Sequence, residues 1–150
     1  MDVDALIEAF NQMNNYGREN GMKLKVIEPG TIEYEMEIQE KHLSSPNNAH
    51  GGSIAGFMDS VIGLSALSAA FAEGNLVSTV EFKINMFKPA HLGDQLLGKG
   101  IVEYKGKSLI SSSGAIYCTN RDNLLIAKAL GTFNVYPIQK ANSVIEGMLS

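Results

Sequence analysis

The fold of this chain is decided by the stretch Asn47–Phe71, whose sequence is NNAHGGSIAGFMDSVIGLSALSAAF. It starts as a polar loop, passes through His50-Gly51-Gly52 and continues as a long apolar segment. Within that segment, large apolar residues recur every three or four positions, which is the spacing of one buried helix face. These residues are Ile54, Phe57, Met58, Val61 and then Leu64 or Ser65. The pattern predicts a central helix against which the other segments pack.

A second stripe of the same helix has almost no side chains. It consists of Gly52, Gly56, Asp59, Gly63 and Ala66. Glycine in a helix interior costs up to about 1 kcal/mol relative to alanine, so its repetition on one face indicates close approach of another backbone or of a ligand. Asp59 is therefore either an ordinary paired or solvated carboxylate, or the floor of a crevice, such as one where two copies of the domain meet.

The sequence His50-Gly51-Gly52 falls at the predicted start of the helix. Backbone N–H groups at a helix N-terminus lack intrahelical partners and lie at the positive end of the helix dipole. They suit an oxyanion or a polarised carbonyl, and glycine lets such a group come close. With a histidine beside these donors and Asp59 nine residues later, this is the candidate site for chemistry.

The flanking segments alternate apolar and polar residues with the period of β-strands. Strands are predicted at 22–26, 32–38, 76–87, 95–104, 108–119 and 124–136. Residues 3–15 are predicted to form an amphipathic helix, and residues 39–50 a loop. The last strands are joined by turns of a few residues and must be antiparallel. The order predicts an α+β domain, with a curved antiparallel sheet of about five or six strands around the central helix.

Length and composition indicate one globular domain. The chain has 150 residues, of which 45% are apolar and 19% are charged. We expect a single domain over residues 1–150, with a core at about 20–136 and a short tail at 138–150. The net charge of −4 argues against a general nucleic-acid-binding surface.

Three features favour a cytoplasmic protein without a membrane span. Residues 53–72 are about as long as a bilayer span, but they include Asp59 and lack basic flanks, so a buried helix explains them better. The single cysteine, Cys118, cannot form an internal disulfide and fits a reducing compartment. The N-terminus MDVDALIEAF has acids where a signal peptide needs positive charge.

Several other motifs are rejected. The sequence around Ser53 resembles a nucleophile elbow, but its last glycine is missing. His42, His50 and His91 do not have the close spacing of metal ligands, and no phosphate-binding or dinucleotide-binding fingerprint occurs. Cys118 fits an apolar core position. We therefore expect no metal and no cofactor.

Taken together, the motifs resemble those of the hotdog-fold acyl-CoA thioesterases of the PaaI type. The resemblance covers roughly residues 20–136, and each motif is weak alone. The motifs are, in order, His50-Gly51-Gly52 with Asp59, then Val77-Ser78-Thr79-Val80, Phe87-Lys88-Pro89-Ala90, Gly93-Asp94 and Lys105-Gly106-Lys107-Ser108.

The resemblance implies a role for each catalytic position. Asp59 matches the family's carboxylate, either nucleophile or general base, and Gly51 matches the N–H donor to the thioester carbonyl. His50 matches the histidine that orients the loop or the thioester. Thr79 matches a hydroxyl that holds the water or the carboxylate. Ser44 stands where many members have asparagine, which puts the role of that position in doubt.

The resemblance also implies how the substrate binds. The turn Lys105-Gly106-Lys107-Ser108 and Lys88 would contact the phosphates of coenzyme A, with Gly52, Asn48 and Met86 also at the substrate. The implied assembly is a homodimer with joined sheets, usually paired into a tetramer, with sites between subunits. Acyl preference would depend on pocket depth, set by side chains such as Phe57, Met58, Met86 and Phe87.

The predicted activity is hydrolysis of an acyl-CoA thioester to a free acid and coenzyme A. The alternative is a non-catalytic acyl-CoA binder or sensor, which would keep the lysine turn but would not need Asp59. Phenylacetyl-like, medium-chain and hydroxybenzoyl groups all remain open as the acyl group.

Overall fold

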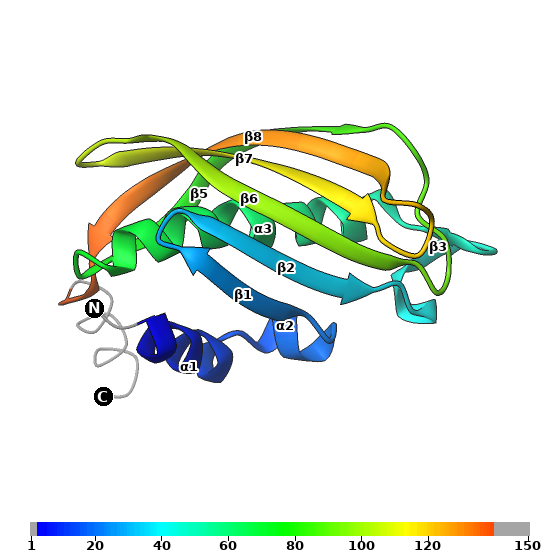
Figure 1. Cartoon of the computed structure of the whole chain (residues 1–150), viewed down its shortest axis with the longest axis horizontal. Helices are drawn as coiled ribbons and strands as arrows, with labels where there is room; N and C mark the ends of the chain where they lie inside the picture. Colours follow the sequence, from blue (N-terminus) through cyan, green and yellow to red (C-terminus); the bar gives the residue numbers. More distant parts are fainter. Residues whose placement is uncertain (1–2, 140–150) are drawn as a thin grey trace.

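The structure is a computed structural model that describes residues 3–139, so the predicted tail at 138–150 lies outside the described residues except for its first two positions. One long helix, α3 (Gly51–Phe71), lies inside a curved sheet (Figure 1). The strands are β1 (Lys23–Glu28), β2 (Thr31–Glu37), β5 (Asn75–Met86), β6 (Gln95–Lys105), β7 (Leu109–Cys118) and β8 (Leu124–Pro137). They form one antiparallel sheet in the order β1-β2-β6-β7-β8-β5. The predicted α+β class is confirmed.

The predicted N-terminal helix is two helices, α1 (Val3–Met13) and α2 (Asn15–Glu19), which lie along one side of the molecule (Figure 1). Asn14 makes the corner between them. Its Oδ1 accepts the Gly17 N–H at 3.0 Å, and its Nδ2 donates to the buried Tyr34 hydroxyl at 3.1 Å. Burial raises the pKa of Tyr34 to about 12.

The prediction of a loop over 39–50 is wrong. The segment contains a short 3₁₀ helix, Glu40–His42, and a two-stranded hairpin of β3 (Leu43–Ser45) and β4 (Asn48–Ala49). The strands are too short for an alternating pattern to mark them. This hairpin delivers the chain to the start of α3.

The core forms where α3 meets the middle of the sheet. The predicted core face, from Ile54 to Leu64, is buried. The sheet carries glycines where the helix comes closest. A methyl group on Gly100 would lie 2.5 Å from the Val61 carbonyl oxygen, and one on Gly114 would lie 2.7 Å from Ile62. Fully burying side chains such as Val61 and Ile62 stabilises the fold by about 1.5–3 kcal/mol each.

The small-residue stripe of α3, expected to meet another backbone or a ligand, is approached by side chains of this chain. A methyl group on Gly56 would overlap the hydroxyl of Tyr16 from α2, and one on Gly63 would contact Phe133 of β8 at 3.4 Å. Ala66 is fully buried. The stripe therefore packs mainly against its own domain, and Asp59 is its polar exception.

The predicted alternation fails on β5. The strand bulges between Thr79 and Glu81, and Val80 and Met86, which alternation places on the apolar face, are 57% and 46% exposed. β5 is an edge strand, so one side of it has no neighbour in this chain. The sheet's interior strands keep the predicted pattern: Ile32, Tyr34 and Met36 of β2 are buried.

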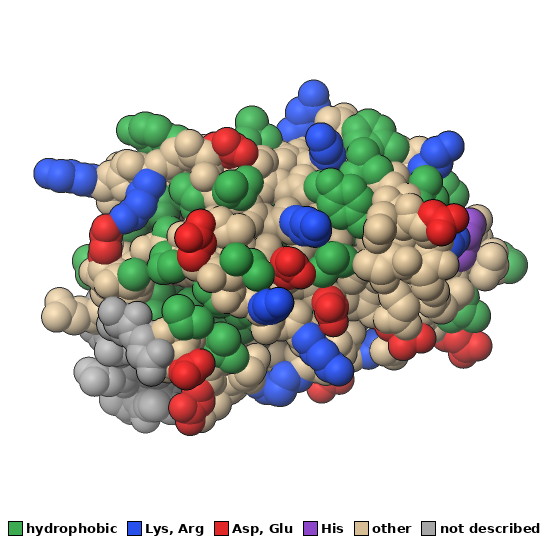
Figure 2. All heavy atoms as spheres, in the orientation of Figure 1, with side chains coloured by type: hydrophobic (Ala, Val, Ile, Leu, Met, Phe, Trp, Pro, Cys, Tyr) green, Lys and Arg blue, Asp and Glu red, His purple; other side chains and the backbone are tan. Residues whose placement is uncertain are grey.

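The outer face of the sheet is charged. Figure 2 shows acidic and basic side chains next to one another across this face, with apolar side chains between and around them. Among the described residues, only α3 is long and apolar enough to cross a membrane, and 56% of its most apolar window is buried inside the domain. It is the core helix around which the sheet curves.

Candidate active site

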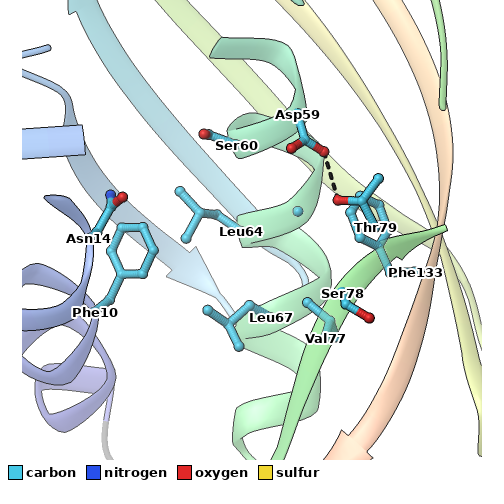
Figure 3. A pocket seen from close by; sticks show the side chains of 11 residues that line it. Phe10, Asn14, Asp59, Ser60, Leu64, Leu67, Val77, Ser78, Thr79 and Phe133 are labelled. Atoms are coloured by element: carbon cyan, nitrogen blue, oxygen red, sulfur yellow. Dashed lines mark hydrogen bonds between the residues drawn. The ribbon is translucent and has the colours of Figure 1, made fainter. Parts of the chain in front are cut away.

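Asp59 projects from α3 toward β5, where Thr79 holds it. The Thr79 hydroxyl donates to Asp59 Oδ1 at 2.8 Å (Figure 3). The two predicted site residues are thus brought together from segments twenty residues apart. The bond occupies one carboxylate oxygen and fixes the direction of the other.

A pocket of about 200 Å³ lies beside this pair. Its apolar walls come from α3, β5, β8 and α1: Leu64, Leu67, Val77, Phe133 and Phe10. Its polar lining is Asn14, Asp59, Ser60, Ser78 and Thr79. Figure 3 shows Phe10 and Asn14 facing α3 across the pocket. A half-buried carboxylate in a pocket with both polar and apolar walls can act on a polar group attached to an apolar body.

The start of α3 leaves one backbone donor free. His50 caps the helix: its Nδ1 accepts the Gly52 N–H at 2.6 Å, and its carbonyl accepts the N–H groups of Ser53 and Ile54. Of the first four N–H groups of α3, only that of Gly51 has no acceptor within the described part of the chain. His50 orients the helix start through this Nδ1 acceptor.

The same bond explains Gly52. A methyl group there would lie 2.7 Å from His50 Nδ1, so the cap requires glycine. The Gly52 N–H is used by the cap, and the predicted substrate role of Gly52 stays a prediction.

A second pocket, of about 180 Å³, opens beside Gly51. It gathers three predicted site residues, Gly51, Met86 and Lys88. The remaining lining is Ala49, Ile54, Phe87, Pro89 and Ala90. Gly51 therefore borders a mainly apolar pocket whose lining includes one lysine.

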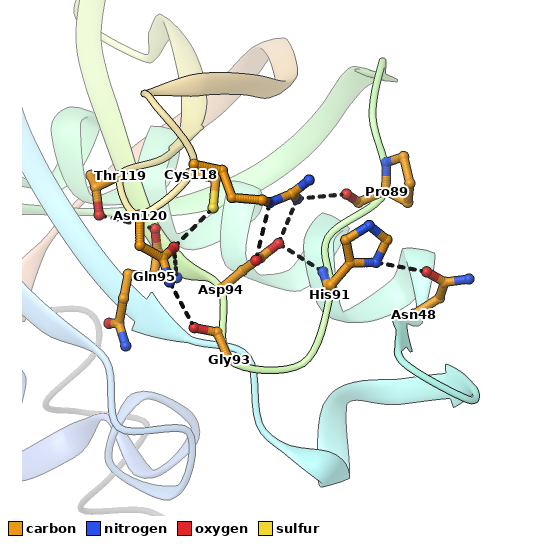
Figure 4. Close-up of polar contacts among 10 residues, drawn as sticks. Asn48, Pro89, His91, Gly93, Asp94, Gln95, Cys118, Thr119 and Asn120 are labelled. Carbon is orange, nitrogen blue, oxygen red and sulfur yellow. Dashed lines mark hydrogen bonds and ion pairs between the residues drawn. The ribbon is translucent and has the colours of Figure 1, made fainter.

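The loop that walls this pocket, residues 87–94, is held by an ion pair between the buried Asp94 and the half-buried Arg121 (Figure 4). Asp94 is 5% exposed; its Oδ2 accepts the His91 N–H at 2.7 Å and bonds Arg121 at 2.5 Å. Arg121 also donates to the Pro89 carbonyl at 3.0 Å. The motif Gly93-Asp94 indicates only a turn, and nothing in the sequence pairs Asp94 with an arginine from the β7–β8 turn.

The sequence did not predict the structural role of Arg121, and it did not predict that of His42 either. It is 4% exposed, its Nδ1 accepts the Gln39 N–H at 2.9 Å, and its Nε2 lies 2.7 Å from Asn20 Oδ1. Its carbonyl accepts the His50 N–H at 2.7 Å. Burial, and then the charge of Lys41, lowers the pKa of His42. His42 thereby fixes the residue that caps α3.

Some predicted residues lie elsewhere. Asn48 bonds His91 Nδ1 through its Oδ1 at 2.9 Å, and Ser44 is exposed on β3. The turn Lys105–Ser108 lies at the opposite end of α3 from Gly51, because Lys105 pairs with Glu73 just beyond Phe71. A helix of 21 residues is about 30 Å long, so this turn and Gly51 of one chain are far apart.

Two of the residues expected to set pocket depth line neither the Asp59 pocket nor the Gly51 pocket. Phe57 and Met58 are fully buried in the core, so neither can contact a bound acyl group. Met86 and Phe87 do line the pocket beside Gly51.

Asp59 and Gly51 are also separated within one chain. Eight residues of helix place them about 12 Å apart along the axis of α3. The Gly51 N–H is on the terminal turn, whereas Asp59 projects sideways toward β5. Each therefore belongs to its own pocket, and one carbonyl group cannot reach both in a single chain.

Known proteins share this architecture. A hypothetical thioesterase from Streptococcus pneumoniae TIGR4, solved with coenzyme A, is 23% identical, with 87% of this chain and 97% of that chain covered and a TM-score of 0.75. Zebrafish thioesterase superfamily member 2 is 20% identical over 89% and 98% of the chains, with a TM-score of 0.77. Escherichia coli PaaI, from the phenylacetic acid degradation operon, is 17% identical over 85% and 88%, with a TM-score of 0.73.

No curated protein sequence matches the chain significantly. The sequence profile of the thioesterase superfamily, however, matches residues 46–124, more than half of the chain. That match covers the start of α3, Asp59, Thr79 and the loop at residues 87–94, but not Phe10, Asn14 and Phe133, which also line the Asp59 pocket. The protein belongs to the thioesterase superfamily and has its hotdog fold.

Proposed function

We propose that the protein hydrolyses acyl-CoA thioesters to a free carboxylic acid and coenzyme A. The observation that carries the proposal is the pair of complementary groups on α3: a carboxylate held by Thr79, and a free N–H at Gly51. Membership of the thioesterase superfamily and the coenzyme A bound to the similar streptococcal protein support the choice of substrate.

In the proposed reaction, the thioester carbonyl oxygen lies against the Gly51 N–H. Negative charge develops on that oxygen when the carbonyl carbon is attacked, and one fixed donor of this kind contributes about 10²–10³ in rate. Asp59 either removes a proton from the attacking water or attacks the carbon itself to give a mixed anhydride that water then cleaves. In both routes the C–S bond breaks and coenzyme A leaves as the thiolate. Both routes stay open.

The proposed site is formed by two chains, because Asp59 and Gly51 of one chain are about 12 Å apart. Asp59 of one subunit would face Gly51 and His50 of the other. β5 is the natural place for the subunits to join. It carries Thr79, it is a sheet edge with unpaired backbone groups, and it exposes Val80. We propose a homodimer joined there, with further pairing into a tetramer.

Coenzyme A would extend from this interface toward basic groups. Lys88 is exposed on the rim of the Gly51 pocket. The turn Lys105-Gly106-Lys107-Ser108 is exposed except at its half-buried glycine, and the Lys105–Glu73 pair is a surface ion pair that contributes little, so a phosphate can replace the glutamate. Ser44, Asn48, Gly52 and Met86 complete the proposed substrate contacts.

A cytoplasmic location fits the buried free thiol of Cys118.

The test is a panel of acyl-CoA substrates incubated with the full-length protein, with release of the thiol followed by a thiol reagent. We expect thiol release from at least one acyl-CoA class at a kcat within the common enzymatic range of about 1–10³ s⁻¹. Tight binding of acyl-CoA without any thiol release would instead support the alternative, a non-catalytic acyl-CoA binder.

A further inference from the structure

A third pocket, called the distal pocket below, adjoins the Asp59 pocket next to α1. It has a volume of about 90 Å³, and its lining is entirely apolar: Leu6, Ala9, Phe10, Met13, Leu67, Phe71 and Leu76. Phe10 and Leu67 also line the Asp59 pocket. The two cavities are therefore neighbours that share one wall, made of these two side chains.

The pockets follow one ridge of α3. Asp59, Gly63, Leu67 and Phe71 are spaced by four residues, which places them in a single row along the helix surface. From Asp59 to Phe71 the row is about 18 Å long. The row begins at the Asp59 carboxylate and ends at the side chains of Leu67 and Phe71. Between them, Gly63 has no side chain to fill the pocket.

α1 covers this row with its own apolar face. Leu6, Phe10 and Met13 are spaced as neighbours on one helix side, and all three line the distal pocket. The C-terminal end of α1 is held by Asn14, whose side chain donates a hydrogen bond to Tyr34 of the sheet. Beneath α1, the Asp59 pocket, which has polar and apolar walls, is thus followed by a smaller pocket whose lining is apolar.

We propose that this channel takes straight-chain fatty acyl groups, and that Phe10, with Leu67, is the gate that sets the longest chain accepted. The proposal rests on the proposed thioesterase function and names its substrate class. A chain whose carbonyl is at Asp59 extends beneath α1, fills the pocket of about 200 Å³ and then meets Phe10. A longer chain must displace the Phe10 ring to enter the distal pocket.

The channel favours flexible chains over ring-bearing acyl groups. Each methylene group buried along its walls improves binding of the transition state by about fourfold, until the gate is reached. A ring can fill the first pocket but gains nothing from the second. Phenylacetyl and hydroxybenzoyl groups, both open on sequence grounds, are therefore poorer fits than aliphatic chains.

The test compares kcat/KM for hexanoyl-, octanoyl-, decanoyl-, dodecanoyl- and hexadecanoyl-CoA with that for phenylacetyl-CoA. For the wild-type protein we expect a rise with chain length, then a plateau or fall. Phe10→Ala joins the two pockets and should raise kcat/KM for the chains beyond that maximum, relative to hexanoyl-CoA, by about tenfold. Phe10→Trp enlarges the gate and should move the maximum to a shorter chain.

Ile27→Ala is the matched control, since it removes an exposed apolar side chain from β1, which does not line either pocket. Its chain-length profile should equal that of the wild type. Profiles that stay the same in both Phe10 variants, or a preference for phenylacetyl-CoA over every aliphatic chain, would overturn the proposal.

Calorimetric titration with dodecanoate separates this proposal from the thioesterase function. Binding that Phe10→Trp weakens and Phe10→Ala preserves or tightens supports the channel even if no acyl-CoA is hydrolysed. If the protein hydrolyses acyl-CoA but neither the chain-length profile nor dodecanoate binding changes in the Phe10 variants, the thioesterase function stands and the channel proposal is wrong.

Discussion

The two ends of the candidate site are built in different ways. At the Asp59 end, both groups are side chains on long elements, α3 and β5, and one hydrogen bond of 2.8 Å suffices to orient the carboxylate. At the Gly51 end, the working group is a backbone N–H, and its position depends on His50, His42 and a loop held by Asp94 and Arg121. The position of the Asp59 carboxylate thus depends on the packing of α3 and β5, whereas the position of the Gly51 N–H depends on a series of polar contacts. Changes remote from Gly51 should therefore disturb the donor more than the acid.

The largest effect is expected at the Asp59 end. Asp59→Asn keeps an oxygen that can accept from Thr79 but loses the charge and the basicity. We expect kcat to fall by about 10²–10⁴ while the unfolding midpoint stays close to that of the wild type. Steady-state kinetics and thermal unfolding measure the two. Near-normal hydrolysis by this variant would remove Asp59 from the mechanism.

At the Gly51 end, Gly51→Pro removes the N–H and puts the proline ring in its place. Proline is well tolerated at the first position of a helix, and His50 already has the extended ψ of 135° that a residue before proline needs. We expect kcat to fall by about 10²–10³. Gly51→Ala is the control for the donor, because it keeps the N–H and its methyl group would only contact Met86 at 3.6 Å. Equal losses in both variants would show that bulk, rather than the donor, matters.

Combining the two ends tests whether the site is shared. Asp59→Asn and Gly51→Pro chains, carrying different tags, are co-expressed and the mixed dimer is purified through both tags. One of its two sites then has wild-type Asp59 facing wild-type Gly51, so activity should return to about half of the wild-type value. Activity no greater than that of the two separate variants would contradict a site between subunits.

Thr79 should matter less than Asp59 itself. Thr79→Val removes the hydrogen bond to the carboxylate without changing the shape of the side chain. Because Thr79 is exposed, we expect a loss of about tenfold or less in kcat. Thr79→Ser restores the hydroxyl and should recover most of the rate. If the serine variant is as slow as the valine variant, Thr79 acts through packing on β5.

The smallest effect is a pH dependence of stability from His42. Burial, and then Lys41, lowers its pKa in the folded state below the usual value of about 6.5. The unfolded chain therefore binds the proton more readily, and the stabilisation is complete above about pH 6.5 and is lost as the pH falls through the folded pKa. Thermal unfolding between about pH 7.5 and pH 5 should show this slope. The His42→Asn variant should have a lower unfolding midpoint that changes less with pH. If the midpoints of the variant and of the wild type change with pH in parallel, His42 is not the source of the pH dependence.

Much of the fold can be predicted from the sequence because its periodicities are strong. The core face of α3 from Ile54 to Leu64 has clear helical spacing, and the alternation in the segment 32–38 marks a half-buried strand. The signal fails where structure depends on few residues or on position in the sheet. The hairpin at 43–49 is too short to show a period, and exposure of Val80 follows from β5 being an edge, which its own sequence does not record.

The sequence by itself determined the chemical groups of this protein: a carboxylate at position 59, a glycine-rich helix start at 50–52 and apolar segments with the correct periods. These are local properties, fixed by residue type and spacing. Only the tertiary structure decided that Thr79 bonds Asp59, that Tyr16 and Phe133 cover the helix glycines, and that Arg121 braces the loop beside Gly51. Each of these joins segments distant in the chain, and such contacts depend on how the sheet closes around α3 rather than on the pattern of any one segment.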